Sequence, residues 1–477
     1  NNHRSRVDLW LHRGPQRSQR TGKEPDAIGP TANIARKDLC YKGDTGGDKM
    51  TDKWDTIDRY VVISADTHAG AELHEYKDYL ESEWHDDFDA WASSYESPFD
   101  DLVDSTASRN WDSDYRLEIL DEDGIAAEVV FPNTIPPFFN TVHTLADLPD
   151  TKETLAPRAA GLRAHNRWLV EFCAKTPGRR LGLIQIMPHD VETAVEEIRW
   201  AASTGVIGGV LIPAIPANHP VGPWFDPRYD PMWAACEELA LPIHQHPGTG
   251  APTVGADLPA ARAVMMFEFS DWTRRTLAHL ILAGVFERFP KLKAVWTEQG
   301  RGIQWVLPEL GRMDPTVAGI KASSASRTMP LFASEVIRSL SLTPSEYFAR
   351  NCYIGASFMP RPEAKYIDAV GVDRIMWGSD FPHEEGTTPH SLEALRSTFA
   401  DVPEEKCRQI FAGVAANVYG FDLDALTPVA QEIGPKVSEI AVPLTQEELP
   451  DSNSGAFAGV FSLSRAPLNV EPATSKS

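Results

Sequence analysis

The chain has 477 residues and a formal net charge of −23, with 42% hydrophobic and 24% charged residues. These proportions are ordinary for a globular protein with a large core. The negative charge argues against nucleic acid and anionic membranes as partners, because both would repel it. No apolar run approaches the ~18 residues of a membrane span. Five scattered cysteines without a C-x-x-C pair fit a reducing compartment, so we expect a cytoplasmic protein.

The first 49 residues differ from the rest of the chain. They contain ten Lys and Arg against six Asp and Glu, lack hydrophobic periodicity and are rich in Gly, Gln, Arg and Pro. This composition predicts disorder. Because the first residue is Asn and Met50 stands directly before the first regular pattern, we interpret residues 1–49 either as a disordered extension or as an artefact of an upstream start assignment. N-terminal sequencing of the native protein distinguishes the two.

From residue 60 onwards, short apolar segments alternate with helical patterns. The predicted strands are 60–65, 126–131, 181–187, 207–213, 241–245, 292–297, 352–357 and 374–379. The predicted helices among them are 190–204, 230–240, 274–288 and 362–370. Buried parallel strands have this length and apolar character. Eight of them alternating with helices predict a (β/α)₈ TIM barrel over residues 50–427, and an open doubly wound sheet is the alternative.

Three segments lie outside the repeating pattern. Residues 70–120 form a long acidic and aromatic insertion, which in a barrel would cover the active-site face. Residues 391–420 are predicted to be closing helices that end at Gly420. Residues 428–477 are rich in Pro, Ser and Glu, and we expect a tail that wraps the surface or reaches a neighbouring subunit.

The first candidate motif, ISADTHAG, ends the first predicted strand. Asp66 and His68 are two residues apart, so their side chains point the same way on a strand. A carboxylate and an imidazole at the carboxyl end of a barrel strand form half of a metal site. The alternative interpretation is a hydrogen-bonded pair that shapes the loop.

The fifth predicted strand contains two histidines in the segment LPIHQHPGTG. His244 and His246 share one face, and the Pro-Gly that follows turns the chain out of the strand. His246 is nearer the strand end and is therefore the better metal ligand. His244 lies one layer deeper, where it is either a ligand or a buried, hydrogen-bonded core residue.

The last two motifs follow the sixth and eighth strands. In WGSDFPHEEG, Asp380 can reach the barrel axis, and His383 can bind substrate, shuttle protons or only stabilise the loop. In VWTEQGRG, Glu298 is a candidate ligand or general base, and Arg301 is a candidate for binding an anionic substrate group. Glu128 on the second strand points either inward or toward the helices, where burial would require a partner.

Taken together, SADTH, HPG, KAVWTEQG and MWGSDFPHEEG followed by NVYGFD resemble the amidohydrolase superfamily. The most similar branch contains the aminocarboxymuconate-semialdehyde and resorcylate decarboxylases, and the resemblance covers residues 60–422. It implies a metal-binding barrel with Asp66, His68, His246 and Asp380 as ligands, in an assembly of two or more subunits.

Two departures from the family pattern bear on function. Many members have H-x-H on the first strand, where this chain has Asp66 in the first position. The related decarboxylases carry a catalytic histidine on the sixth strand, where this chain has Glu298. A glutamate does not supply the acid–base chemistry of an imidazole.

The resemblance implies a metal-dependent hydrolase or non-oxidative decarboxylase acting on a small, ring-bearing organic acid, amide or lactone. Carboxylate and imidazole ligands suit Zn²⁺, Mn²⁺ or Fe²⁺, with one or two ions per chain. Asp380, Glu298 or His383 would manage the proton. If Glu128, Glu298 and His244 all join the site, it is similar to that of rare non-haem diiron monooxygenases on this fold. A barrel kept as a binding protein with a degraded site is the third possibility.

Overall fold

The computed structural model describes residues 53–97, 102–139, 148–248, 250–252, 254–255, 257–300, 302–323, 334–451 and 460–461. The chain divides into two units, Asn1–Thr45 and Gly46–Ser477, and all described residues belong to the second. The interpretation of residues 1–49 therefore falls outside the described residues. Among the residues that are described, no helix is long and apolar enough to span a membrane.

Eight parallel strands form a single sheet in the order β1 to β8. Their bounds are β1 Ile63–Ala69, β2 Ala127–Pro132, β3 Arg180–Gln185, β4 Ile207–Leu211, β5 Ile243–Gln245, β6 Ala294–Thr297, β7 Cys352–Ser357 and β8 Ile375–Gly378. The two edges of the sheet meet, because the amide of Asp380 donates to the carbonyl of Asp66 (2.9 Å) and the amide of His68 to the carbonyl of Phe381 (2.6 Å). The predicted barrel is confirmed, and the open sheet is wrong.

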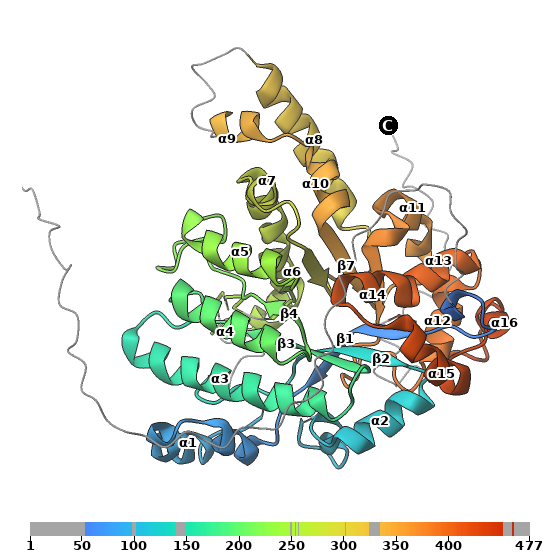
Figure 1. The fold of residues 1–477 in the computed structure, drawn as a ribbon, viewed down its shortest axis with the longest axis horizontal. Helices are drawn as coiled ribbons and strands as arrows, with labels where there is room; N and C mark the ends of the chain where they lie inside the picture. The colour runs from blue at the N-terminus through green and yellow to red at the C-terminus, as the bar shows by residue number, and fades with distance from the viewer. Residues whose placement is uncertain are drawn as a thin grey trace, which may run out of the picture. The chain divides into compact units, whose positions relative to one another are not determined.

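Helices surround the strands (Figure 1). Their bounds are α1 His85–Ala92, α2 Ser113–Glu122, α3 Lys152–Ala174, α4 Val191–Ser203, α5 Asp230–Glu238, α6 Ala261–Leu282, α7 Val285–Arg288, α8 Val306–Ala322, α9 Ser334–Ser339, α10 Pro344–Asn351, α11 Ile367–Val370, α12 Ser391–Phe399, α13 Glu404–Arg408, α14 Val414–Tyr419, α15 Leu423–Ile433 and α16 Val437–Ile440. A π-helical turn joins α13 to α14. The strands are buried almost throughout, as expected for a parallel sheet covered by helices.

One predicted helix, 274–288, differs from the structure at both ends. Helix α6 begins much earlier, at Ala261, and Gly284 (φ 68°) separates it from the short α7. The first turns of α6 expose Met266 and Phe267 to solvent, so apolar residues there do not mark a buried face. The amphipathic period that reveals a helix is therefore absent from that part of the sequence.

The insertion between β1 and β2 packs against the loop that leaves β2. The Trp91 indole donates to the carbonyl of Phe139 (3.2 Å), and the rings of Trp91 and Phe138 lie 5.9 Å apart. That loop follows the carboxyl end of β2, so this contact brings the insertion beside the mouth of the barrel. The expected boundary between barrel and tail, at residue 428, falls inside α15.

Candidate metal centre

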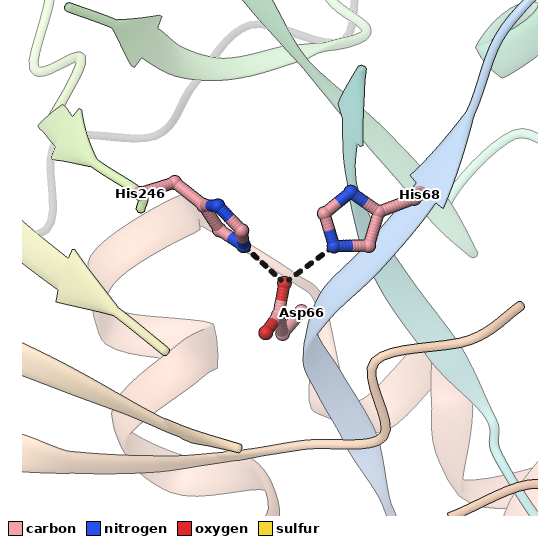
Figure 2. Close-up of side chains that lie close together, drawn as sticks. All are labelled: Asp66, His68 and His246. Carbon is pink, nitrogen blue, oxygen red and sulfur yellow. Dashed lines mark ion pairs between the residues drawn. The ribbon is translucent and has the colours of Figure 1, made fainter. Parts of the chain in front are cut away.

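The candidate site lies where four strands end. Asp66 and His68 belong to β1, His246 directly follows β5, Glu298 directly follows β6, and Asp380 lies two residues beyond β8. The carboxyl ends of parallel barrel strands meet at one face, which brings these distant segments together. Figure 2 shows the imidazoles of His68 and His246 pointing toward the carboxylate of Asp66.

Among the described residues, four buried atoms of candidate ligands in this site have no hydrogen-bond partner: Asp66 Oδ1, His68 Nε2, His246 Nε2 and Asp380 Oδ2. Asp66 Oδ1 lies 3.4 Å from His68 Nε2 and 3.6 Å from His246 Nε2. His68 Nε2 lies 3.0 Å from Asp380 Oδ1. A buried polar atom without a partner costs about 1–3 kcal/mol. Asp66, His68 and His246 form one group whose ligand atoms lie within 4.8 Å of one another, and Asp380 joins Asp66 and His68 in the overlapping groups, so these atoms fit a divalent cation that would accept a lone pair from each.

The backbone fixes the orientation of the two imidazoles. Nδ1 of His68 lies 3.2 Å from the carbonyl oxygen of Pro132, and Nδ1 of His246 lies 2.8 Å from that of Pro247. A carbonyl oxygen only accepts hydrogen bonds, so Nδ1 of each ring carries the proton. The lone pair of each neutral ring is then on Nε2, the atom that points into the site. This backbone support is typical of histidines that bind metals.

The carboxylates are held by the backbone and by neighbouring side chains. The hydroxyl of Ser357, at the end of β7, donates to Asp66 Oδ2 and leaves Oδ1 for the site. Glu298 and Asp380 have φ angles of 53° and 59°, in the left-handed region that residues other than glycine rarely adopt. Such backbone strain gathers at functional sites, where the surrounding fold stabilises it.

The charges of the site shift the pKa values of its members. Burial raises the pKa of Asp66, but the imidazoles of His246 and His68 outweigh burial and lower it. Burial lowers the pKa of His246, yet Asp66 and Glu298 raise it well above its usual value. Burial and the charge of Asp380 raise the pKa of Glu298. Glu298 Oε2 lies 3.1 Å from His246 Nε2.

His383 contacts the site from the loop after β8. Its Nδ1 lies 2.9 Å from Asp380 Oδ1, and its Nε2 lies 3.1 Å from Asn133 Oδ1. The side chain is 24% exposed, whereas Asp380 is fully buried. Burial raises the pKa of Asp380, but His383 and His68 together lower it. His383 therefore connects a buried carboxylate with solvent.

In the described part of the chain, three overlapping groups of side chains can hold a metal ion. They are Asp66 with His68 and His246, His68 with Asp380 and His383, and Asp66 with Glu298 and Asp380. All three groups belong to the site already described. The structure thus brings together six of the eight site residues predicted from the sequence.

The other two predicted residues, His244 and Arg301, are not part of this cluster. His244 lies below the site, with Nε2 3.1 Å from the hydroxyl of Tyr419 and its ring stacked on the tyrosine ring. Burial lowers the pKa of His244 to about 3, so it is a neutral core residue. The core alternative for His244 fits this structure, and the ligand alternative does not. Arg301 falls outside the described residues.

Glu128 also faces away from the site. Its carboxylate accepts hydrogen bonds from Arg116 (2.6 Å), Arg180 (2.7 Å) and the hydroxyl of Thr67 (2.8 Å). Burial raises the pKa of Glu128, but the two guanidinium groups outweigh burial and lower it to about 2. Glu128 has the partners that the alternative of burial toward the helices requires, and the alternative of an inward carboxylate for a second iron is wrong.

Sequence analysis did not single out two polar side chains that contact the site. Ser357 supports Asp66, and Asn133 contacts His383. Both follow or end a strand at the carboxyl face, which is the only signal that the sequence offers for them. Serine and asparagine are common at strand ends and turns, so that signal does not single them out.

Comparisons with known proteins agree with this geometry. A model of the amidohydrolase family matches residues 148–421. The gamma-resorcylate decarboxylase of a Polaromonas strain is 26% identical over 315 residues, covering 64% of this chain and 86% of that protein. The 2-amino-3-carboxymuconate-6-semialdehyde decarboxylase of Dictyostelium discoideum is 22% identical over 318 residues, covering 66% of this chain and 78% of that protein.

A solved structure supports the same fold. It is the 5-carboxyvanillate decarboxylase of Novosphingobium aromaticivorans, complexed with manganese and 4-hydroxy-3-methoxy-5-nitrobenzoic acid. The match has a TM-score of 0.57 and 19% sequence identity, and it covers 76% of this chain and 97% of the other. At this identity the likeness shows a shared barrel.

Proposed function

Because this chain belongs to the amidohydrolase family, we propose that it is a metal-dependent enzyme that removes the carboxyl group of a small aromatic acid without oxidation. The observation that carries this proposal is the set of four buried nitrogen and oxygen atoms that have no hydrogen-bond partner among the described residues, beside a carboxylate that His383 links to solvent. Such a site binds a cation and can also supply a proton. The two relatives described above are decarboxylases, which supports the same reaction type.

Asp66, His68, His246 and Asp380 would hold one divalent cation. Two imidazoles with two carboxylates suit Mn²⁺, Fe²⁺ and Zn²⁺, and manganese is the ion named for the neighbouring solved structure. We therefore propose manganese. When bound, the cation would polarise the substrate's oxygens and hold its carboxylate in place. Glu298 would lie beside this set, with Oε2 3.1 Å from His246 Nε2, where burial and the charge of Asp380 raise its pKa.

The protein's main chemical task is to protonate a ring carbon. The bond between the ring and the carboxyl carbon breaks, its electron pair stays on the ring carbon, and carbon dioxide leaves. The ring carbon then takes a proton. Since His383 and His68 keep the pKa of Asp380 low, Asp380 rests as an anion, and we assign the proton supply to His383 through Asp380. Partial exposure lets His383 take up the next proton from solvent.

The proposal is tested with hydroxybenzoates labelled with ¹³C in the carboxyl group. Manganese-loaded protein is incubated with them in heavy water without oxygen. We expect labelled carbon dioxide and one deuterium on the carbon that had carried the carboxyl group. Asp380→Asn and His246→Ala should each lower turnover at least 100-fold, within the range of general acid catalysis and metal chemistry. The exposed His74 supplies a control, and His74→Ala should retain full turnover.

Other outcomes identify the competing functions. In a parallel assay with aryl amides and lactones, cleavage without carbon dioxide would mean a hydrolase. When the hydroxybenzoate incubation is repeated in air, consumption of oxygen with hydroxylation of the ring would mean a monooxygenase. Full turnover in Asp380→Asn or His246→Ala would remove that residue from the site.

We further propose that the enzyme works in the cytoplasm as a homo-oligomer. Four cysteines, Cys173, Cys236, Cys352 and Cys407, are buried free thiols, which is consistent with a reducing compartment. Sedimentation of the full chain measures the assembly, and a single monomeric species would contradict this proposal.

A further inference from the structure

The ring of His383 is held on three sides. Its Nδ1 faces Asp380 Oδ1 at 2.9 Å, and its Nε2 faces Asn133 Oδ1 at 3.1 Å. The ring also packs on His68, with ring centroids 4.2 Å apart and 30° between the planes. If the ring turned over, the carbon Cδ2 would replace Nδ1 beside Asp380. A proton could then no longer pass between the two side chains.

The orientation of the Asn133 amide is set by a second asparagine. Asn110 Nδ2 donates to the carbonyl oxygen of Ala107 (3.1 Å), which only accepts hydrogen bonds. The amide oxygen of Asn110 therefore faces Asn133 and accepts from its Nδ2. Asn133 in turn presents its own oxygen to His383. Each amide has only one orientation that satisfies this chain of contacts.

Asn110 comes from the insertion and is fully buried. It ends the short 3₁₀ helix Ala107–Asn110, and its carbonyl accepts from the amide of Gly70, directly after β1. Asn133 directly follows β2. The series of hydrogen bonds that ends at His383 thus begins in the segment between β1 and β2, which is far in sequence from the loop after β8.

We propose that Asn133, oriented by Asn110, is a positioning residue that keeps Nδ1 of His383 aimed at Asp380. This proposal rests on the proposed function for its kinetic consequences. The insertion then takes part in the reaction: its buried asparagine sets the direction in which His383 donates.

The first test does not depend on activity. Diethyl pyrocarbonate acylates imidazole nitrogens, and peptide mass spectrometry measures the rate at His383 in the metal-loaded protein. Asn133→Ala removes the side chain that contacts Nε2 of His383 and lets the imidazole ring rotate. We therefore expect His383 to react at least threefold faster in this variant. Asn110→Leu should have the same effect, whereas Asn110→Asp keeps an acceptor for Asn133 and should stay near the wild-type rate. An unchanged rate in Asn133→Ala and Asn110→Leu would overturn the proposal.

The second test is kinetic. In Asn133→Ala, kcat should fall about 10- to 100-fold, the cost of a misplaced catalytic group, while KM and metal content stay unchanged. In a His383→Ala background, the same substitution should cost nothing further, because residues acting through one group are not additive. Equal losses in both backgrounds would show a merely structural role and contradict the proposal.

Asn166 is the matched control. It is a buried asparagine on α3 whose amide donates to the carbonyl of Gln185 (2.9 Å) and to Glu197 (2.9 Å), away from the site. Asn166→Ala should leave the acylation rate of His383 and kcat unchanged. If the wild-type protein decarboxylates no aromatic acid, the proposed function fails, and the acylation rates alone decide whether Asn133 positions His383.

Discussion

At Asp66, one carboxylate divides its two oxygens between the protein and the site. Oδ2 accepts from Ser357, whereas Oδ1 faces two imidazoles and has no hydrogen-bond partner in the described part of the chain. At His68 and His246 the same division is made between the two ring nitrogens. Each proposed ligand is thus fixed by one atom and could bind a cation by another, as is typical of metal ligands in proteins.

Metal affinity should rise with pH because protons and the cation compete for the same atoms. Asp66 and Glu298 raise the pKa of His246, so its Nε2 is protonated over more of the pH range than in an ordinary histidine. Below that pKa, each bound cation displaces a proton, and affinity should increase about tenfold per pH unit. Titration calorimetry with Mn²⁺ between pH 6 and pH 8 measures this slope. An affinity that does not change over this interval would contradict the assignment of His246 as a ligand.

Substitution of Glu128 should affect stability and leave the metal in place. Glu128→Gln leaves Arg116 and Arg180 buried without their counter-charge, which typically costs about 3–5 kcal/mol. Urea unfolding and metal analysis of the same sample measure both effects. Glu197→Gln should cost less than Glu128→Gln, because the Arg167 side chain is 34% exposed and solvent screens its charge. If Glu128→Gln lost its metal and kept its free energy of unfolding, Glu128 would have to be counted among the metal ligands.

Among the elements, the strands follow from the sequence better than the loops. All eight predicted strands are present, because runs of apolar residues flanked by polar ones are a local signal. Asp66 and His68 were predicted to converge from their spacing alone. In the structure the pairing of β1 with β2 is irregular between Ser64 and Thr67, a feature often found beside active sites.

The remaining parts of the site depend on contacts that the sequence does not show. The two-residue spacing predicts that His244 lies on the same face as His246, but it does not predict how deep His244 lies in the barrel. That depth depends on the stacking of its ring on Tyr419, far along the chain. From the sequence alone Glu128 is a candidate ligand, because its contacts with Arg116 and Arg180 are visible only in the structure. Such distant partners are chosen by tertiary packing, and no local pattern predicts them.

Strand β8 fits closely against Asp66 because Gly378 has no side chain. A Cβ atom at this position would lie 2.6 Å from the Cβ of Asp66 and 3.0 Å from the hydroxyl oxygen of Ser357. Gly378→Ala should therefore push Asp66 out of place and weaken manganese binding at least 10-fold, as measured by calorimetry. Gly208→Ala on β4 is the control, since its nearest contact is the Cβ of Leu181 at 3.1 Å, away from the site. Equal affinity in the two variants would contradict this account.

In the barrel as a whole, the contacts that close the sheet also bring the residues of the site together. The backbone hydrogen bonds that join β1 to the segment after β8 involve Asp66, His68 and Asp380, the same residues that would bind the cation. A ligand that binds only the closed barrel stabilises it against unfolding. The cation should therefore stabilise the contact between the first and last strands.

Removal of the metal should lower thermal stability. An ion present at 100 times its dissociation constant contributes about 2.7 kcal/mol, and its loss leaves Asp66, Asp380 and Glu298 as neighbouring carboxylates. Scanning calorimetry before and after chelation measures the change in Tm, and added Mn²⁺ should restore it. An unchanged Tm would favour a barrel that has lost its metal site and only binds ligands.

The central claim, that Asp66, His68, His246 and Asp380 hold one catalytic cation, is tested most directly by counting metal in the full-length protein purified without added ions. We predict one divalent ion per chain by mass spectrometry of the elements, and none in a variant that combines His246→Ala with Asp380→Asn. Two irons per chain, or no metal in a stable and active protein, would contradict the claim.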